Sequence, residues 1–149
     1  MKICFICHAN ICRSFMAQEI LKKFIIDDNR NDIKVISRGT YVLSQFLVPQ
    51  KIKDFLKKNN IEYTEHIPTQ YSKEDLASSD FIFVMTKDQL KLLNDNYAQF
   101  SDKTYLFLEY CFNINKDMQD PIDKKGTAFD TIANDIKKTT LMLYKKIIL

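Results

Sequence analysis

Short apolar runs alternate along this chain with longer stretches in which apolar residues recur every three or four positions. The apolar runs cover residues 2–6, 33–37, 81–85 and 104–108, and their length and composition are typical of strands buried on both faces. The amphipathic stretches begin near residues 14, 49, 72, 87 and 127, and their spacing predicts helices. Residues 61–71 and 109–125 are predicted to form loops.

This alternation predicts an α/β fold. Strands separated by helices form a parallel sheet, and the helices cover both of its faces. A chain of 149 residues is long enough for one domain with a sizeable core, so residues 1–149 are predicted to form a single domain. Ligands bind at the carboxyl ends of the strands in such sheets, and functional residues are therefore expected directly after the strands.

The first strand and the first helix are joined by a loop with an informative spacing. Cys7 directly follows the strand, Arg13 precedes the helix and Ser14 opens it, which gives C-x5-R-S. A loop that enters a helix N-terminus points several backbone N–H groups at one place, where the helix dipole adds positive character. Such a loop can bind an anion of the size of phosphate.

The two residues that bracket this loop supply reactive chemistry. Arg13 can hold two phosphate oxygens with its planar guanidinium. Cys7 lies at the start of the loop, beneath the bound anion, where the same N–H groups and Arg13 stabilise a thiolate. A thiolate that faces a bound phosphorus atom is an activated nucleophile. The predicted phosphate-binding residues are His8, Ala9, Asn10, Ile11, Cys12, Arg13 and Ser14.

Residues 6–15 resemble the signature of the low-molecular-weight protein tyrosine phosphatases. That signature is V-C-x-G-N-x-C-R-S-P, and this chain reads I-C-H-A-N-I-C-R-S-F, so that Ala9 replaces Gly and Phe15 replaces Pro. The family is one domain of about this length, so the resemblance covers the whole chain. It implies a flavodoxin-like fold with strand order 2-1-3-4. It also implies hydrolysis of phosphotyrosine in protein substrates through a cysteinyl-phosphate, with no cofactor and no metal.

The leaving oxygen needs a proton, and Asp120 is the candidate donor. A carboxylic acid on a loop near the pocket is the usual supplier, and Pro121 holds the backbone of Asp120 extended. Asp120-Pro121 matches the D-P motif of the family, which continues with aromatic residues that wall the phenyl ring of the substrate. This chain has Ile122 there, which weakens the assignment to tyrosine more than the assignment to phosphatase chemistry. Tyr41 and Phe46 are candidates for an aromatic wall elsewhere.

The resemblance also implies a group of supporting residues around Asn10. Asn is one of the few residues other than Gly that adopt a left-handed backbone. In the family this Asn is held by the Ser after Arg, by a Ser after the second strand and by a more distant His, and Ser14, Ser37 and His66 occupy those places. Ala9 would cost about 1 kcal/mol more than Gly if its φ had to be positive.

Composition narrows the remaining classes of function. The net charge of +3 is too small to indicate nucleic-acid binding, and the 2 glycines exclude a glycine-rich nucleotide loop. No apolar span of membrane length and no secretory signal is evident. The 4 cysteines lie mostly near the N-terminus and do not form a secreted disulfide framework. We therefore expect a cytoplasmic protein with reduced thiols and with neither membrane nor nucleic-acid partners.

Other interpretations of the cysteines fit the pattern less well. Residues 4–8 spell C-F-I-C-H, a haem attachment pattern, yet a strand would point Cys4 and Cys7 to opposite faces, which also disfavours a redox pair. A zinc site lacks a second paired cluster. Thiol-coupled arsenate reductases share the fold and the loop but use a downstream cysteine pair, whereas only Cys111 is present here.

Two further alternatives stay open on the sequence alone. Because the chain departs from the family at Ala9, Phe15 and Ile122, it could bind phosphorylated partners with little or no turnover. It could also hydrolyse a phosphoester other than phosphotyrosine. The presence of Cys7, Arg13 and Asp120 together favours an active enzyme.

Cys12 is predicted to protect Cys7 from irreversible oxidation. A reactive thiolate is readily oxidised to a sulfenic acid. A loop curled around one phosphate brings Cys7 and Cys12 close to the roughly 4.4–6.8 Å between Cα atoms that a disulfide needs. Cys4 lies upstream within the strand, and nothing in the sequence places Cys111 in the pocket, so Cys12 is the expected disulfide partner.

Overall fold

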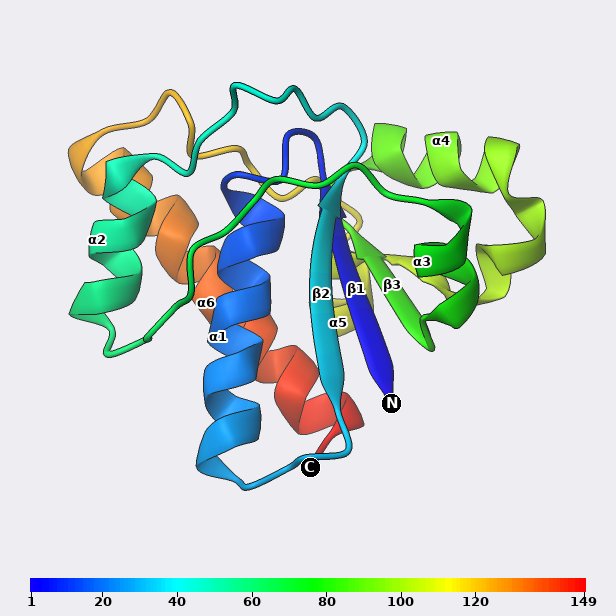
Figure 1. Cartoon of the computed structure of the whole chain (residues 1–149), viewed down its shortest axis with the longest axis horizontal. Helices are drawn as coiled ribbons and strands as arrows, with labels where there is room; N and C mark the ends of the chain where they lie inside the picture. The colour runs from blue at the N-terminus through cyan, green and yellow to red at the C-terminus, as the bar shows by residue number, and fades with distance from the viewer.

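One sheet of four parallel strands forms the centre of the computed structural model, which describes residues 1–149 (Figure 1). Its strands are β1 (Lys2–Cys7), β2 (Lys34–Gly39), β3 (Phe81–Val84) and β4 (Thr104–Leu106). Their order across the sheet is β2-β1-β3-β4, and every neighbouring pair is parallel. The predicted α/β class and strand order are therefore confirmed.

Helices cover both faces of this sheet and form two cores. The larger core contains side chains from α1 (Arg13–Asp27), α2 (Gln50–Lys58), α5 (Phe107–Phe112) and α6 (Gly126–Ile147). The smaller core contains side chains from α3 (Lys73–Ser78) and α4 (Lys87–Asn96). Figure 1 shows α1 and α6 on one side of the sheet and α3 and α4 on the other. None of the helices combines the length and the apolar character that a membrane span requires.

The central strand β1 contributes to both cores. Ile3, Phe5 and Cys7 belong to the larger core, and Cys4 and Ile6 belong to the smaller one, as the two-residue period of a strand requires. The thiols of Cys4 and Cys7 therefore point to opposite faces of the sheet. Burial on both faces explains why this strand is a continuous apolar run in the sequence.

Two of the predicted helix starts follow from capping chemistry. Ser72 and Thr86 are the N-caps of α3 and α4, and each forms a capping box with the residue three positions later. A 3-10 turn, η1 (Ala98–Lys103), which the apolar pattern does not indicate, links α4 to β4. The second strand extends to Gly39, two residues beyond the predicted end.

The predictions for residues 104–108 and 109–125 are partly wrong. β4 ends at Leu106, and α5 follows at once over Phe107–Phe112, where the pattern predicts the end of a strand and the start of a loop. Phe107 and Cys111 lie one helical turn apart and both are buried in the larger core. Two apolar positions are too few to show a helical period beside a preceding apolar run. Asn113, with a φ of 61°, ends α5, and the long loop begins there.

Candidate active site

The loop between β1 and α1 presents backbone N–H groups at the carboxyl edge of the sheet. Cys7 is the last residue of β1 and Arg13 is the first residue of α1. Cys12 is the N-cap of α1, yet it makes no side-chain capping hydrogen bond, and the first turn contains no acidic residue. The first N–H groups of α1 therefore lack a capping side chain, and together with the helix dipole they favour an anion at this position.

Asn10 connects this loop to the rest of the molecule. It is fully buried and has a φ of 58°, in the left-handed region that Asn tolerates. Its side-chain amide donates to Ser14 Oγ at 2.8 Å and to Ser37 Oγ at 3.0 Å, and its Oδ1 accepts from the Thr69 N–H at 2.9 Å.

Ala9 is not among the residues with positive φ, so the backbone strain considered for the replacement of the family's Gly by Ala does not arise.

His66 supports the same loop from outside. Its Nε2 lies 2.8 Å from the carbonyl oxygen of Asn10, and because a carbonyl can only accept, this nitrogen carries the proton. Burial lowers the pKa of His66, and the hydrogen bond to Asn10 only partly opposes that effect. The ring of Phe15 stacks on the imidazole with 4.3 Å between centroids, and Tyr63 meets Phe15 edge-on. Phe15, at the position of the family's Pro, therefore helps to hold His66 neutral and in place.

The Cys7 sulfur has a hydroxyl beside it. Cys7 Sγ lies 2.9 Å from Ser14 Oγ, and Cys7 is 2% exposed. Because Ser14 Oγ already accepts a hydrogen bond from Asn10 Nδ2, its own proton is free to point at the sulfur. The structure therefore places a hydrogen-bond donor directly beside the candidate nucleophile.

Arg13 joins the loop to a distant part of the chain. Its Nη1 donates to the carbonyl oxygen of Met118 at 3.0 Å, and its Nη2 lies 3.3 Å from Asp120 Oδ2. The Arg13 side chain is 7% exposed, whereas that of Asp120 is 42% exposed. One guanidinium therefore lies between a buried anchor and a carboxylate that is accessible to solvent.

The segment that carries Asp120 is attached to the sheet just before that residue. The Met118 N–H donates to the carbonyl oxygen of Met85, directly after β3, at 2.8 Å. Asp120 Oδ1 accepts from the Ile122 N–H at 3.1 Å, which orients the carboxylate, and Pro121 is buried. The loop thus brings Asp120 to the carboxyl edge of the sheet, next to Arg13.

Gly39 belongs to this site, although sequence reasoning did not identify it. It pairs with Cys7 across β1 and β2, and a Cβ atom on it would lie 2.7 Å from the His8 carbonyl oxygen and 2.5 Å from Val42 Cγ2. Only Gly allows the phosphate loop to pass this close to β2. The available signal was its place at the end of a strand in a chain with only 2 glycines.

The remaining loop residues have distinct surroundings. The ring of His8 stacks on that of Tyr41 with 5.5 Å between centroids, and Tyr41 is 55% exposed. Of the two candidates for an aromatic wall, Tyr41 therefore lies directly beside the loop, whereas no ring contact ties Phe46 to it. Ile11 packs against the larger core.

The three other thiols are also buried. Burial is the largest cause that raises the pKa of Cys4, Cys12 and Cys111, in each case to about 12. For Cys12, the charges of Asp120 and Cys7 add to the rise in its pKa. No group of three or more His, Cys, Asp or Glu side chains is arranged to hold a metal ion.

Known proteins match this chain over nearly its whole length. The family model for low molecular weight phosphotyrosine protein phosphatase matches residues 2–148. A curated relative, the low molecular weight protein-tyrosine-phosphatase PtpB of Staphylococcus haemolyticus, is 30% identical over 146 residues, which cover 97% of this chain and 96% of the relative.

Solved structures share the fold. A low molecular weight protein tyrosine phosphatase from T. tengcongensis covers 99% of each chain with a TM-score of 0.91 and 24% identity. The YwlE arginine phosphatase from Geobacillus stearothermophilus has a TM-score of 0.87 and 22% identity, covering 98% of this chain and 92% of its own. These two likenesses show the fold, while the family model and the curated relative show more: this chain belongs to the low molecular weight phosphotyrosine protein phosphatase family.

Proposed function

We propose that Cys7, Arg13 and Asp120 hydrolyse phosphotyrosine in protein substrates without a metal ion. The observation that supports this assignment is the contact of 3.3 Å between Arg13 and Asp120. Arg13 begins α1 directly after the loop that Cys7 opens. One guanidinium therefore links the anion-binding loop to the candidate proton donor.

In the first step, the Cys7 thiolate attacks phosphorus in line with the ester bond. An S–P bond forms while the P–O bond to the tyrosyl oxygen breaks, and Asp120 gives its proton to that oxygen. Arg13 and the N–H groups of the loop hold the other phosphoryl oxygens and stabilise their charge in the transition state. The products are the free hydroxyl of the substrate and a cysteinyl-phosphate.

In the second step, water attacks phosphorus from the side that the leaving group vacated. Asp120, now ionised, takes a proton from this water, the S–P bond breaks and inorganic phosphate leaves. The electron pair returns to Cys7 as a thiolate, which the Ser14 hydroxyl at 2.9 Å stabilises. Asp120 is again protonated, so the cycle closes without a cofactor.

The preference for a phosphotyrosyl side chain rests on depth and on Tyr41. Cys7 is 2% exposed, so a long aryl ester reaches its sulfur more easily than the short side chain of phosphoserine. The exposed ring of Tyr41, stacked on His8, offers a flat apolar surface for the phenyl ring of the substrate. Because an arginine phosphatase shares the fold, phosphoarginine is the necessary comparison.

We place this enzyme in a reducing compartment such as the cytoplasm. All its cysteines are free and buried, and a nucleophilic thiolate stays active only where it is kept reduced. Two of these thiols, Cys7 and Cys12, lie in the phosphate loop itself.

The test is hydrolysis of p-nitrophenyl phosphate by the purified protein, its Cys7→Ser variant, and the wild type with a chelator. We expect Cys7→Ser to lose at least about a thousandfold in kcat and the chelator to have no effect. Matched phosphotyrosine, phosphoserine and phosphoarginine peptides then identify the substrate. Activity retained in Cys7→Ser would refute the chemistry, and faster turnover of phosphoserine or phosphoarginine would refute the preference for tyrosine.

A further inference from the structure

The second half of the Asp120 loop has few attachments to the rest of the molecule. Residues 122–125 are exposed. Within the loop, the Lys124 N–H donates to the Pro121 carbonyl oxygen. The Lys125 carbonyl oxygen accepts from the Phe129 N–H at the start of α6. Every other hydrogen bond between residues 121–125 and more distant parts of the chain comes from Lys51, in the first turn of α2.

Lys51 holds this segment through an arrangement suited to an ammonium group. Its Nζ donates to the carbonyl oxygens of Ile122 and Lys124, the latter at 2.9 Å. It also lies 5.4 Å from the centroid of the Phe129 ring in α6. Two of the three ammonium donors bond to carbonyls, the charge faces an aromatic ring, and Lys51 forms no ion pair with any carboxylate.

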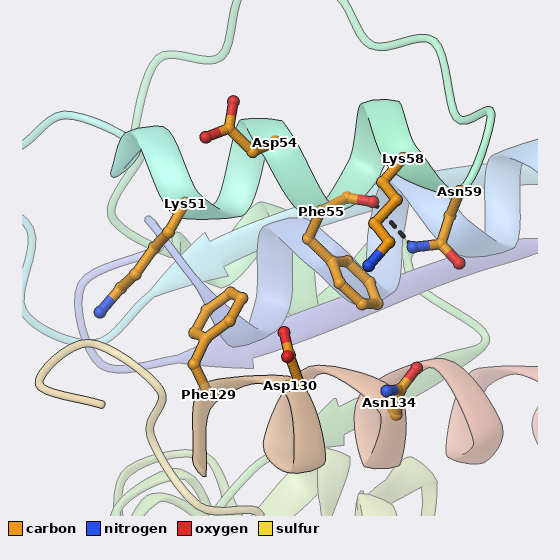
Figure 2. A pocket seen from close by; sticks show the side chains of 8 residues that line it. All are labelled: Lys51, Asp54, Phe55, Lys58, Asn59, Phe129, Asp130 and Asn134. Atoms are coloured by element: carbon orange, nitrogen blue, oxygen red, sulfur yellow. Dashed lines mark hydrogen bonds between the residues drawn. The ribbon is translucent and has the colours of Figure 1, made fainter. Parts of the chain in front are cut away.

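Figure 2 shows Lys51 at one end of a cavity of about 360 Å³ between α2 and α6. Its side chain extends away from the cavity, whereas Lys58, at the other end of α2, lies along it. The neighbouring carboxylate of Asp54 accepts from Gln50 instead. The charge of Lys51 also opposes the rise in the pKa of Cys12 that burial causes.

We propose that Lys51 is a positioning residue that holds the Asp120 loop against α2, so that Asp120 reaches the leaving oxygen. This inference rests on the proposed function of Asp120. Arg13 and Met118 fix the chain up to Asp120, and Lys51 fixes it from two residues later. Without Lys51, the segment after Asp120 would be held only by the buried Pro121 and by the Ile122 N–H bond to Asp120 itself, so Asp120 would spend less time in line with the ester oxygen.

The test compares Lys51→Met with Lys58→Met on two substrates. Met keeps the length and the apolar stem of Lys but removes its donors. The variant keeps the Asp120 carboxyl group but loses its position. We therefore expect kcat to fall about tenfold for phenyl phosphate, whose leaving group is poor, and to change little for an activated aryl phosphate, whose leaving group needs no proton. Lys58→Met lies on the same helix beside the same cavity (Figure 2) and should change neither rate. Lys51→Arg, which keeps the charge and the donors, should restore most of the loss.

A double-mutant cycle separates positioning from general stability. If Lys51 acts through Asp120, adding Lys51→Met to Asp120→Ala causes no further loss for phenyl phosphate. Equal losses on both substrates, additive losses in the cycle, unchanged rates in Lys51→Met, or the same loss in Lys58→Met would each overturn the proposal. If Lys51→Met does not fold, Lys51→Gln, which keeps a polar head but is too short to reach the loop, gives the same comparison. Retained activity in Cys7→Ser is a separate result and refutes only the underlying function.

Discussion

Arg13 and Asp120 are 107 positions apart in the chain, and their side chains meet at 3.3 Å. Arg13 is buried and also anchored to the Met118 carbonyl, so the more solvent-accessible partner of this pair is Asp120. A phosphate group bound in the loop competes with Asp120 for the same guanidinium donors. If the proposed function is correct, we expect substrate binding to weaken this ion pair and to leave the Asp120 carboxyl group available to the leaving oxygen.

Replacement of Asp120 by Ala should slow turnover in proportion to how much the leaving group needs a proton. We expect a loss of roughly two to four decades in kcat for phenyl phosphate and much less for a strongly activated aryl phosphate. Asp123→Ala, which removes an exposed carboxylate in the same loop, is the matched control and should change neither rate. Equal losses of Asp120→Ala on both substrates would assign Asp120 another role.

Replacement of Gly39 by Ala should push the phosphate loop out of place. The new Cβ would lie 2.7 Å from the His8 carbonyl oxygen, and backbone cannot yield as a side chain can. Overpacking of this kind costs about 1–3 kcal/mol in the free energy of unfolding, and we expect kcat/KM to fall by about tenfold or more. Gly126→Ala is the control, because Gly126 has a φ of 55° with nothing within 4 Å of the new Cβ. It should lower stability while leaving activity intact below the unfolding temperature.

Acidification should destabilise the fold through His66. Burial lowers the folded-state pKa of His66 below its ordinary value of 6.5. Below pH 6.5, the unfolded chain therefore binds more protons at His66 than the native protein does. The stability that comes from neutral His66 is lost as the pH falls from 6.5 toward the folded-state pKa.

Urea unfolding of wild type and His66→Gln at several pH values between about 7 and 5 measures this effect. The free energy of unfolding of the wild type should fall more steeply than that of His66→Gln. His8→Gln, at the only other histidine, is the matched control, and the difference from wild type should be larger for His66→Gln than for His8→Gln. Parallel curves for wild type and His66→Gln would contradict the prediction.

Mild peroxide followed by a reductant should inactivate and then restore the wild type. We predict a Cys7–Cys12 disulfide, because both thiols are buried in one loop and the charge of Cys7 contributes to the raised pKa of Cys12, about 12. Cys12 is therefore protonated at rest and reacts only once Cys7 has been oxidised to a sulfenic acid.

Cys12→Ser should lose activity irreversibly under the same treatment, as Cys7 proceeds to the sulfinic acid. Cys111→Ser is the control, since Cys111 lies in α5 and is also buried, and it should recover as the wild type does. Full recovery of Cys12→Ser, or peptide mapping that joins Cys7 to Cys4 or Cys111, would show that Cys12 is not the partner.

The local part of the site could be predicted because its signals are local. Cys7, Asn10, Arg13 and Ser14 lie within one strand, loop and helix start, and their spacing reflects backbone geometry that a few residues fix on their own. The apolar run of β1 and the capping residues Ser72 and Thr86 likewise act over short range. The order of the strands came from the family resemblance and is confirmed by the pairing of β1 with β2 and β3 and of β3 with β4.

The contacts between distant segments were decided only by the tertiary structure. The sequence around Gly39 does not show that the His8 carbonyl oxygen would lie 2.7 Å from a Cβ at that position. The sequence around Lys51 does not indicate Ile122 and Lys124 as its partners.

The helix α5 was missed for the same reason, since Phe107 and Cys111 become a helical pair only against the larger core. The spacing of Cys7, Asn10, Arg13 and Ser14 in the sequence determined which side chains lie in or beside the loop, because residues so close in the chain are placed by local backbone geometry. The tertiary packing determined that Gly39, Thr69 and Met118 meet that loop, because these residues are its neighbours only in space.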